Sequence, residues 1–311
     1  MTVQENRGPA GAAVGAGDVQ ARLMLVGVCL IWGVTWPVMR IALNEIPPLS
    51  MRASTAGIGT LTMLAICLVT RRSLRLRFGK TWLHAIATSL LNVVAFSLLS
   101  AFAQIETATS RVAILTYTMP IWAVLLAWVV LGERPTRVHL VALGLCVVGL
   151  AVLISPLART GIPLGVLLAV GSGLSWAAGT VYLKWARVSA DPMGFASWQI
   201  TIAFVLIASA TLIFEGRLNL SGAHTSALLA VAFSGIAGNA LAYALWFGVV
   251  RRVSAVTASL GALATPVIGV VATVLVLGER PSTADIVGFA LIFTASACVV
   301  FAPLLRAKKP R

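Results

Sequence analysis

Aromatic and amide side chains recur at helical spacing in two apolar stretches of the chain. Two triplets show intervals of four and three residues and lie 147 residues apart: Asn92, Phe96 and Leu99, then Asn239, Tyr243 and Trp246. Residues at these intervals share one face of a helix. Aromatic rings bind apolar or cationic groups, and amides bind polar groups. The triplets therefore predict a binding surface for a small organic molecule, although the asparagines could instead hold helices together.

Other side chains could belong to the same binding surface. Trp32 and Trp36 share a helical face, and Trp176 repeats the position of Trp32 in the second half of the chain. If these stretches cross a membrane, the alternative for the tryptophans is a place at the water–lipid boundary. Arg52 could bind the carboxylate of an amino or organic acid, or its long side chain could reach lipid headgroups. Tyr117 is a further candidate for substrate contact.

Residues for catalysis or metal binding do not cluster in the sequence. It contains no Gly-x-Ser-x-Gly, His-Glu-x-x-His or nucleotide-binding motif. The four cysteines are isolated within apolar stretches, so neither a metal site nor a disulfide framework is expected. We therefore expect no catalytic residue, no metal, no other cofactor and no enzyme activity.

A proline-centred apolar segment occurs twice and ends each time in Leu-Gly-Glu-Arg-Pro. Pro120 and Pro266 are 146 residues apart, and so are Glu133 and Glu279. A proline inside a helix leaves the carbonyl four residues earlier without its hydrogen bond, so Pro120 and Pro266 could act as hinges or could form fixed kinks. The glutamates follow helix C-termini, where an anion needs a cationic partner. We expect Glu133 and Glu279 to form structural latches.

The composition indicates which elements position these side chains. Hydrophobic residues make up 59% of the 311-residue chain and charged residues only 10%, whereas soluble domains contain about 25% charged residues. Such a chain needs lipid as its solvent, and in lipid the backbone must be bonded within helices. Ten stretches reach the length of about 20 residues that crosses a bilayer, which predicts an all-α protein with ten transmembrane helices. These stretches lie near residues 23–44, 49–70, 82–103, 107–131, 138–156, 163–184, 193–214, 226–250, 254–277 and 284–304.

The distribution of Lys and Arg predicts the orientation of these helices. With the N-terminus in the cytoplasm, 17 of the 23 basic residues fall on the cytoplasmic side, as the positive-inside rule requires. Both termini are therefore expected in the cytoplasm. Anionic lipid headgroups account for the basic surplus, so no nucleic-acid partner is expected.

The ten predicted helices divide into two groups of five. Because five is an odd number, the two copies of the repeat must cross the membrane in opposite orientations. We expect a disordered cytoplasmic tail at 1–21, a first repeat at 22–156, an inverted second repeat at 157–305 and a basic cytoplasmic tail at 306–311. Inverted repeats are typical of secondary transporters, which bind their substrate between the repeats near the middle of the membrane.

The sequence resembles the ten-helix EamA-type transporters of the drug/metabolite transporter superfamily. The matching features are the Ile-Trp-Gly motif at residues 31–33, the two proline-centred segments with their Leu-Gly-Glu-Arg-Pro ends, and glycines in the fifth and tenth predicted helices: Gly144, Gly149 and Gly288. The resemblance implies a carrier for amino acids, other metabolites or drugs. It also implies a central cavity lined by helices 1–4 and 6–9.

We expect an inner-membrane carrier that exports amino acids or related small metabolites by alternating access. Efflux of hydrophobic or cationic drugs is the alternative, but drug–proton exchange commonly uses a carboxylate in mid-membrane, and no Asp or Glu has such a position. An intramembrane enzyme or a lipid scramblase is a distant alternative without a supporting motif. The expected partners are the substrate and the lipid bilayer, and the sequence leaves monomer and homodimer open.

Overall fold

The computed structural model describes residues 16–157, 162–250, 252 and 264–307, and every regular element in this part of the chain is helical. The all-α class is thereby confirmed. The α-helices are α1 (Ala16–Leu43), α2 (Pro48–Val69), α3 (Lys80–Thr88), α4 (Phe96–Glu106), α5 (Thr109–Thr116), α6 (Met119–Leu131), α7 (Arg137–Ile154), α8 (Leu164–Ala186), α9 (Pro192–Phe214), α10 (Thr225–Phe233), α11 (Ala242–Val250), α13 (Ala264–Leu277) and α14 (Thr283–Ala307). Segments η1 (Ser89–Ala95) and η3 (Ser234–Leu241) are π-helical, and η2 (Ser155–Leu157) is a 3-10 turn.

Eight helices of the described residues are long and apolar enough to cross a membrane. They are Gln20–Leu43, Pro48–Val69, Lys80–Glu106, Thr109–Leu131, Arg137–Ile154, Leu164–Ala186, Pro192–Phe214 and Thr225–Val249. Each matches one of the first eight predicted spans within a few residues. Two shorter apolar helices, Ala264–Leu277 and Thr283–Cys298, lie within the ninth and tenth predicted spans. The start of the ninth span falls outside the described residues.

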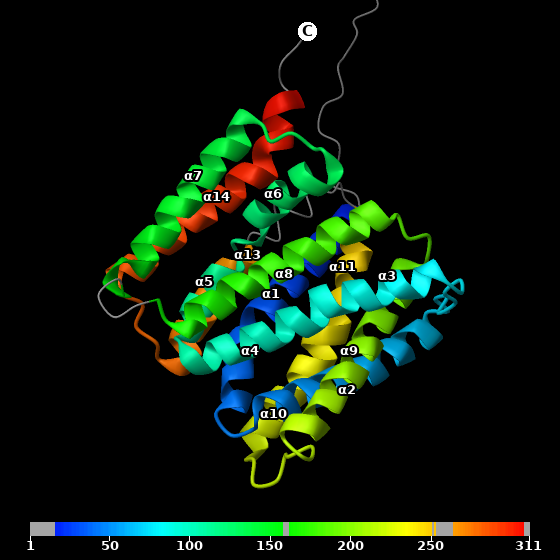
Figure 1. The fold of residues 1–311 in the computed structure, drawn as a ribbon. Coiled ribbons are helices and arrows are strands. Elements are labelled where there is room, and N and C mark those ends of the chain that lie inside the picture. Colours follow the sequence, from blue (N-terminus) through cyan, green and yellow to red (C-terminus); the bar gives the residue numbers. More distant parts are fainter. Residues whose placement is uncertain (1–15, 158–161, 251, 253–263, 308–311) are drawn as a thin grey trace, which may run out of the picture.

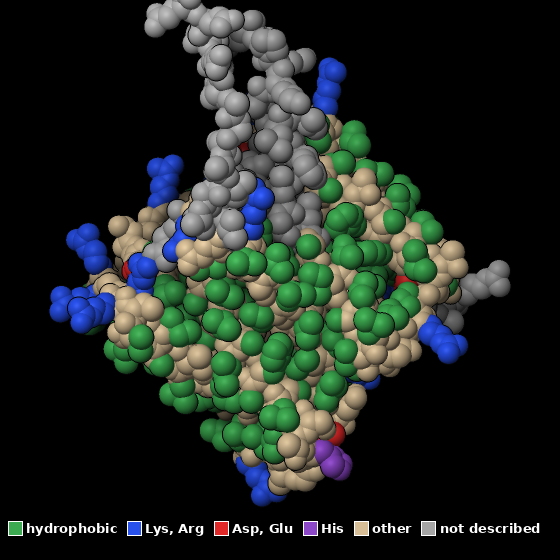
Figure 2. Space-filling model, turned by 180° about the vertical axis from the view of Figure 1, so that it is seen from behind, with side chains coloured by type: hydrophobic (Ala, Val, Ile, Leu, Met, Phe, Trp, Pro, Cys, Tyr) green, Lys and Arg blue, Asp and Glu red, His purple; other side chains and the backbone are tan. Residues whose placement is uncertain are grey.

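Large hydrophobic side chains cover the outside of the bundle. Leu61, Val129, Ile213 and Leu275 are each more than two-thirds exposed. On the face drawn in Figure 2, hydrophobic side chains form a broad surface, with Lys and Arg at its margins. An exposed apolar surface of this kind is stable only against another apolar phase, which here is lipid.

Helices from the two halves of the chain pack against each other. Helix α1 packs chiefly on α13 and α11, whereas α8 packs chiefly on α4 and α6. Helices α2 and α9 form another pair, and α7 lies along α14 (Figure 1). Glycines allow this last pair to approach closely, because a Cβ on Gly149 would lie 3.1 Å from the carbonyl oxygen of Gly288. The halves therefore form one bundle and are not two separate domains.

The span Thr109–Leu131 is interrupted at its proline. Helix α5 ends at Thr116, and α6 begins at Met119 with Pro120 in its first turn, where no helical hydrogen bond is lost. Side chains satisfy backbone carbonyls at the break: Thr118 Oγ1 donates to the Leu115 carbonyl at 2.7 Å, and Ser296 Oγ donates to the Tyr117 carbonyl at 3.1 Å. Pro266 lies in α13 and is buried.

Carboxylates from one half cap helix N-termini of the other half. Both oxygens of Glu279 accept hydrogen bonds from the first residues of α5, at 2.8 Å from the Thr109 N–H and at 3.0 and 2.6 Å from the N–H and hydroxyl of Ser110. Glu215 binds the start of α2 in the same way, through the N–H groups of Leu49 and Ser50 and the Ser50 hydroxyl. These anions satisfy N–H groups that have no partner within the helix and lie at the positive end of its dipole.

Glu133 has a different environment from Glu279, although the two are equivalent in the repeated sequence. Its Oε1 pairs with Lys184 Nζ of α8 at 2.6 Å, with side chains 50% and 62% exposed. Sequence reasoning gave both glutamates one role as latches. In the structure both contacts do join the two halves, but only Glu279 caps a helix.

Two further contacts tie helix ends together. Arg111 of α5 binds both oxygens of Asp285 in α14, at 2.8 and 3.1 Å. In the connecting loops, the backbone N–H of His224 donates to Glu45, and this hydrogen bond holds the pKa of that carboxyl below its usual value. The bidentate pair is partly buried, and the loop contact is solvent-exposed.

We predict that Glu279→Gln destabilises the protein by about 1–2 kcal/mol, because a charged cap with three hydrogen bonds is weakened. Glu133→Gln should have an effect below about 1 kcal/mol, because it removes an exposed ion pair. Glu215→Gln is the matched variant and should behave like Glu279→Gln. Thermal unfolding in detergent measures all three, and an equal loss in the Glu133 and Glu279 variants would contradict this assignment.

Candidate functional site

Two aromatic pairs join the first half of the chain to the second. Trp32 of α1 meets Tyr243 of α11 with ring centroids 5.7 Å apart and planes at 77°. Phe96 of α4 meets Trp176 of α8 at 4.9 Å and 63°. Both are edge-to-face contacts, a favourable geometry for aromatic rings. Because Trp32 corresponds to Trp176 and Phe96 to Tyr243 in the repeated sequence, the two pairs are equivalent.

The predicted aromatic residues of the second half form one cluster. The Trp246 ring lies 6.0 Å from that of Trp32, and Trp32 Nε1 donates to the Gly238 carbonyl in η3 at 3.3 Å. Trp32, Tyr243 and Trp246 are each half-buried. Each ring therefore keeps part of its surface uncovered by the protein. Trp176 does not join this cluster but occupies the equivalent place beside Phe96.

The two predicted asparagines lie in the two π-helical segments. Asn239 of η3 donates from Nδ2 to the Thr55 carbonyl in α2 at 3.3 Å, so it connects two helices. Asn92 of η1 packs against Gly179 of α8, and its buried Oδ1 has no hydrogen-bond partner among the described residues. π-helical turns are rare and frequently occur at functional sites. Both asparagines thus lie at contacts between helices, Asn92 against α8 and Asn239 against α2.

Trp36 and Tyr117 lie beside the interrupted span. Trp36 is one turn along α1 from Trp32 and is buried. The side chain of Tyr117, at the junction of α5 and α6, interacts with those of Trp36 and Thr265. The break in the helix therefore faces α1 and α13, close to the Trp32 side of the site.

Arg52 is buried where α1, α2 and α4 meet. Its Nη2 donates to Ser100 Oγ at 2.9 Å, and its Nη1 contacts Met39 Sδ at 2.9 Å. Met39 lies seven residues beyond Trp32 on the same face of α1, which corresponds to about 10 Å along a helix. Arg52 thus lies at one end of a row of α1 side chains that starts at the aromatic cluster. It does not reach outward to lipid headgroups.

Sequence reasoning missed three polar residues around this site: Ser100, Gln104 and Glu215. Ser100 and Gln104 are four residues apart in an apolar helix, and this spacing was the available signal. Glu215 directly follows α9, so its capping role depends on a tertiary contact that the sequence does not show.

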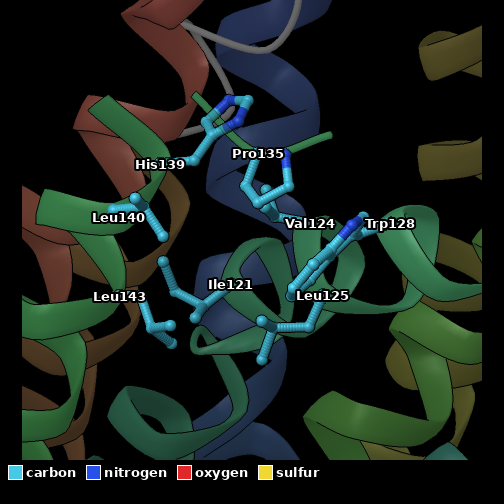
Figure 3. Close-up of a pocket in the computed structure, with 8 residues that line it drawn as sticks. All are labelled: Ile121, Val124, Leu125, Trp128, Pro135, His139, Leu140 and Leu143. Carbon is cyan, nitrogen blue, oxygen red and sulfur yellow. The ribbon is translucent and has the colours of Figure 1, made fainter. Parts of the chain in front are cut away.

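Two hollows border α6. A small cavity of about 40 Å³ lies between α6 and α7, with apolar side chains and His139 around it (Figure 3). A larger cavity of about 550 Å³ extends from Pro120 past Ala127 to Glu133 and Arg134. Its volume is typical of a site for a small molecule. None of the predicted aromatic residues is among its described lining residues, so it forms a separate space on the Glu133 side of the break.

Tyr243→Ala and Trp246→Ala should weaken the apparent affinity for a transported solute by about 1–3 kcal/mol each, because each removes a large apolar contact. Phe96→Ala is the matched variant in the other half. Transport in proteoliposomes gives the affinity, and thermal unfolding in detergent gives the stability. If affinity is unchanged while stability falls in every variant, these rings only pack the helices.

Comparison with known proteins identifies the family. The profile described as "EamA-like transporter family" matches residues 20–155 and again residues 163–301. "Uncharacterized transporter YvbV" of Bacillus subtilis is 28% identical over 281 residues, which cover 89% of this chain and 90% of that protein. "Uncharacterized inner membrane transporter YedA" of Escherichia coli K12 is 25% identical over 290 residues, 92% of each chain.

Two further comparisons concern the fold and a more distant relative. "Probable amino-acid metabolite efflux pump" of Escherichia coli K12 is 24% identical and covers 88% of this chain and 92% of its own. A protein of known crystal structure has a TM-score of 0.65 at 24% identity, over 94% of this chain and 99% of its own, which supports the fold alone. With both halves of its sequence matched by the family profile, this multi-pass membrane protein belongs to the EamA-like transporter family.

Proposed function

We propose that this protein is a secondary transporter that exports amino acids or related small metabolites across the inner membrane by alternating access. The observation that carries the proposal is the matched pair of aromatic contacts, Trp32–Tyr243 and Trp176–Phe96, each of which joins one half of the chain to the other. A solute bound between these contacts would touch both halves. Its binding would then respond to any movement of one half against the other.

The proposal includes two inverted five-helix repeats. The family profile matches the chain twice, and a π-helical segment occurs in each half. Contacts between helix ends also agree with alternating spans. In the inverted arrangement, Glu215 and Glu279 would lie on the same side of the membrane as the helix starts that they cap. Glu133 and Lys184, which form an ion pair, would both lie on the opposite side. These features support the inverted arrangement.

The two latches lie at opposite ends of the span Thr109–Leu131. Glu279 caps its first residues, whereas Glu133 follows its last residue and pairs with Lys184. In the orientation expected from Lys and Arg, the capped end is outside and the ion pair is cytoplasmic. The 550 Å³ cavity extends to the cytoplasmic end, which fits a path that opens inward while the outer end is tied closed.

Export of amino acids is favoured over drug–proton exchange by the position of the acidic residues. The glutamates Glu45, Glu133, Glu215 and Glu279 lie beyond the ends of helices, and Glu106 is the last residue of α4. None of them is therefore placed in mid-membrane to exchange a proton for a cation. One relative named as an amino-acid metabolite efflux pump agrees with this substrate class. The proposed location in the inner membrane is supported by the relative YedA, whose name describes an inner membrane transporter.

Uptake and efflux in proteoliposomes test the proposal, with labelled amino acids, nucleosides and cationic dyes and with or without a pH gradient. We expect transport of amino acids that persists without a pH gradient. Glu133→Gln and Glu279→Gln should lower the amount of folded protein or the rate but leave any response to the gradient unchanged. Transport of dyes alone, driven by the pH gradient and lost in these variants, would replace the proposal with drug–proton exchange.

A further inference from the structure

Arg52 is a buried cation without a carboxylate partner. Its side chain is 93% buried, since its relative exposure is 7%. Of its five N–H donors, one reaches Ser100 Oγ at 2.9 Å, and one reaches the Met39 thioether, a weak acceptor, at 2.9 Å. Nε has no hydrogen-bond partner among the described residues. A buried charge normally requires a paired anion.

The nearby carboxylates are already bonded to other groups. Glu215 lies at the start of α2, but its two oxygens accept from Leu49 and Ser50. Within the described part of the chain, the ion pairs of the acidic residues involve Arg72, Arg111, Lys184 and His224, and none involves Arg52. Arg111 has a bidentate carboxylate partner in Asp285, whereas Arg52 has only a hydroxyl and a thioether.

A second buried polar side chain without a partner lies on the same helix as Ser100. Gln104 is fully buried, and both its Nε2 and its Oε1 have no partner among the described residues. It is one helical turn from Ser100 on α4, so the two side chains share a face. The backbone carbonyl of Gln104 accepts a hydrogen bond from Arg40, which places a second guanidinium beside the site.

We propose that Arg52, positioned by its hydrogen bond to Ser100, and Gln104 bind the carboxylate of the transported solute. This inference rests on the proposed transport function and specifies its substrate as a monocarboxylate with an apolar body. A guanidinium matches the two oxygens of a carboxylate, and the Gln104 amide supplies a further donor. From this anchor the α1 face leads through Met39 and Trp36 toward the ring of Trp32.

Binding to the purified full-length protein in detergent tests the site without transport. The probes are two carboxylates, phenylacetate and L-phenylalanine, and their uncharged-end counterparts, phenylacetamide and L-phenylalaninamide. The change in intrinsic tryptophan fluorescence measures the binding of each probe. We expect the wild-type protein to bind each carboxylate about tenfold or more tightly than its amide, as charge-assisted hydrogen bonds would give. Arg52→Gln should reduce this preference to about one, and Arg52→Lys should retain part of it.

Arg217→Gln is the matched control, because Arg217 is exposed in the loop after α9 and its loss should leave the preference unchanged. Ser100→Ala and Gln104→Leu should each reduce the preference for the carboxylate over its amide. These two variants test the site if Arg52→Gln does not fold. The inference is overturned if the wild-type protein shows no preference for carboxylates. It is equally overturned if folded Arg52→Gln keeps the preference, or if both substitutions on α4 leave it unchanged.

The binding and transport experiments separate the two proposals. If the protein transports solutes but binds carboxylates and amides equally, the carrier function stands and the carboxylate site is wrong. If carboxylates bind through Arg52 but no solute in the panel is transported, the site stands and the carrier function is wrong.

Discussion

The structure depends on one constraint: polar backbone groups inside an apolar bundle must find partners within the protein. At the starts of α2 and α5, carboxylates from the opposite part of the chain meet this need, through Glu215 and Glu279. At the break before Pro120, Thr118 and Ser296 meet it. Glu215, Glu279 and Ser296 therefore satisfy backbone groups and also join the two halves.

Much of the fold could be predicted from the sequence because lipid imposes a simple pattern. Long apolar stretches became helices within a few residues of the predicted bounds. The equivalence of Trp32 with Trp176 was also visible and corresponds to equivalent aromatic contacts. Helical spacing identifies residues that share a face, and in a duplicated chain the same face occurs twice.

The remaining features depend on tertiary contacts that no local pattern encodes. The π-helical segments around Asn92 and Asn239 pack against α8 and α2, and the apolar pattern of the sequence does not distinguish them from α-helix. The difference between Glu133 and Glu279 likewise arises because the same motif meets different neighbours. Ser100 became part of the site only when α4 and α2 were brought together. The site therefore combines predictable faces with polar contacts that only the folded structure reveals.

The central claim is that the two halves move against each other so that the ends of the bundle open in turn. Pulsed electron paramagnetic resonance can measure the distance between two spin labels at each end of the bundle in a cysteine-free variant. The label pairs are placed on exposed positions: Ala108 with Arg280 at one end, and Arg134 with Arg187 at the other. We expect two distances for each pair, and substrate should shift the populations so that one end widens as the other narrows. A single unchanged distance at both ends, or widening of both ends together, would contradict the account.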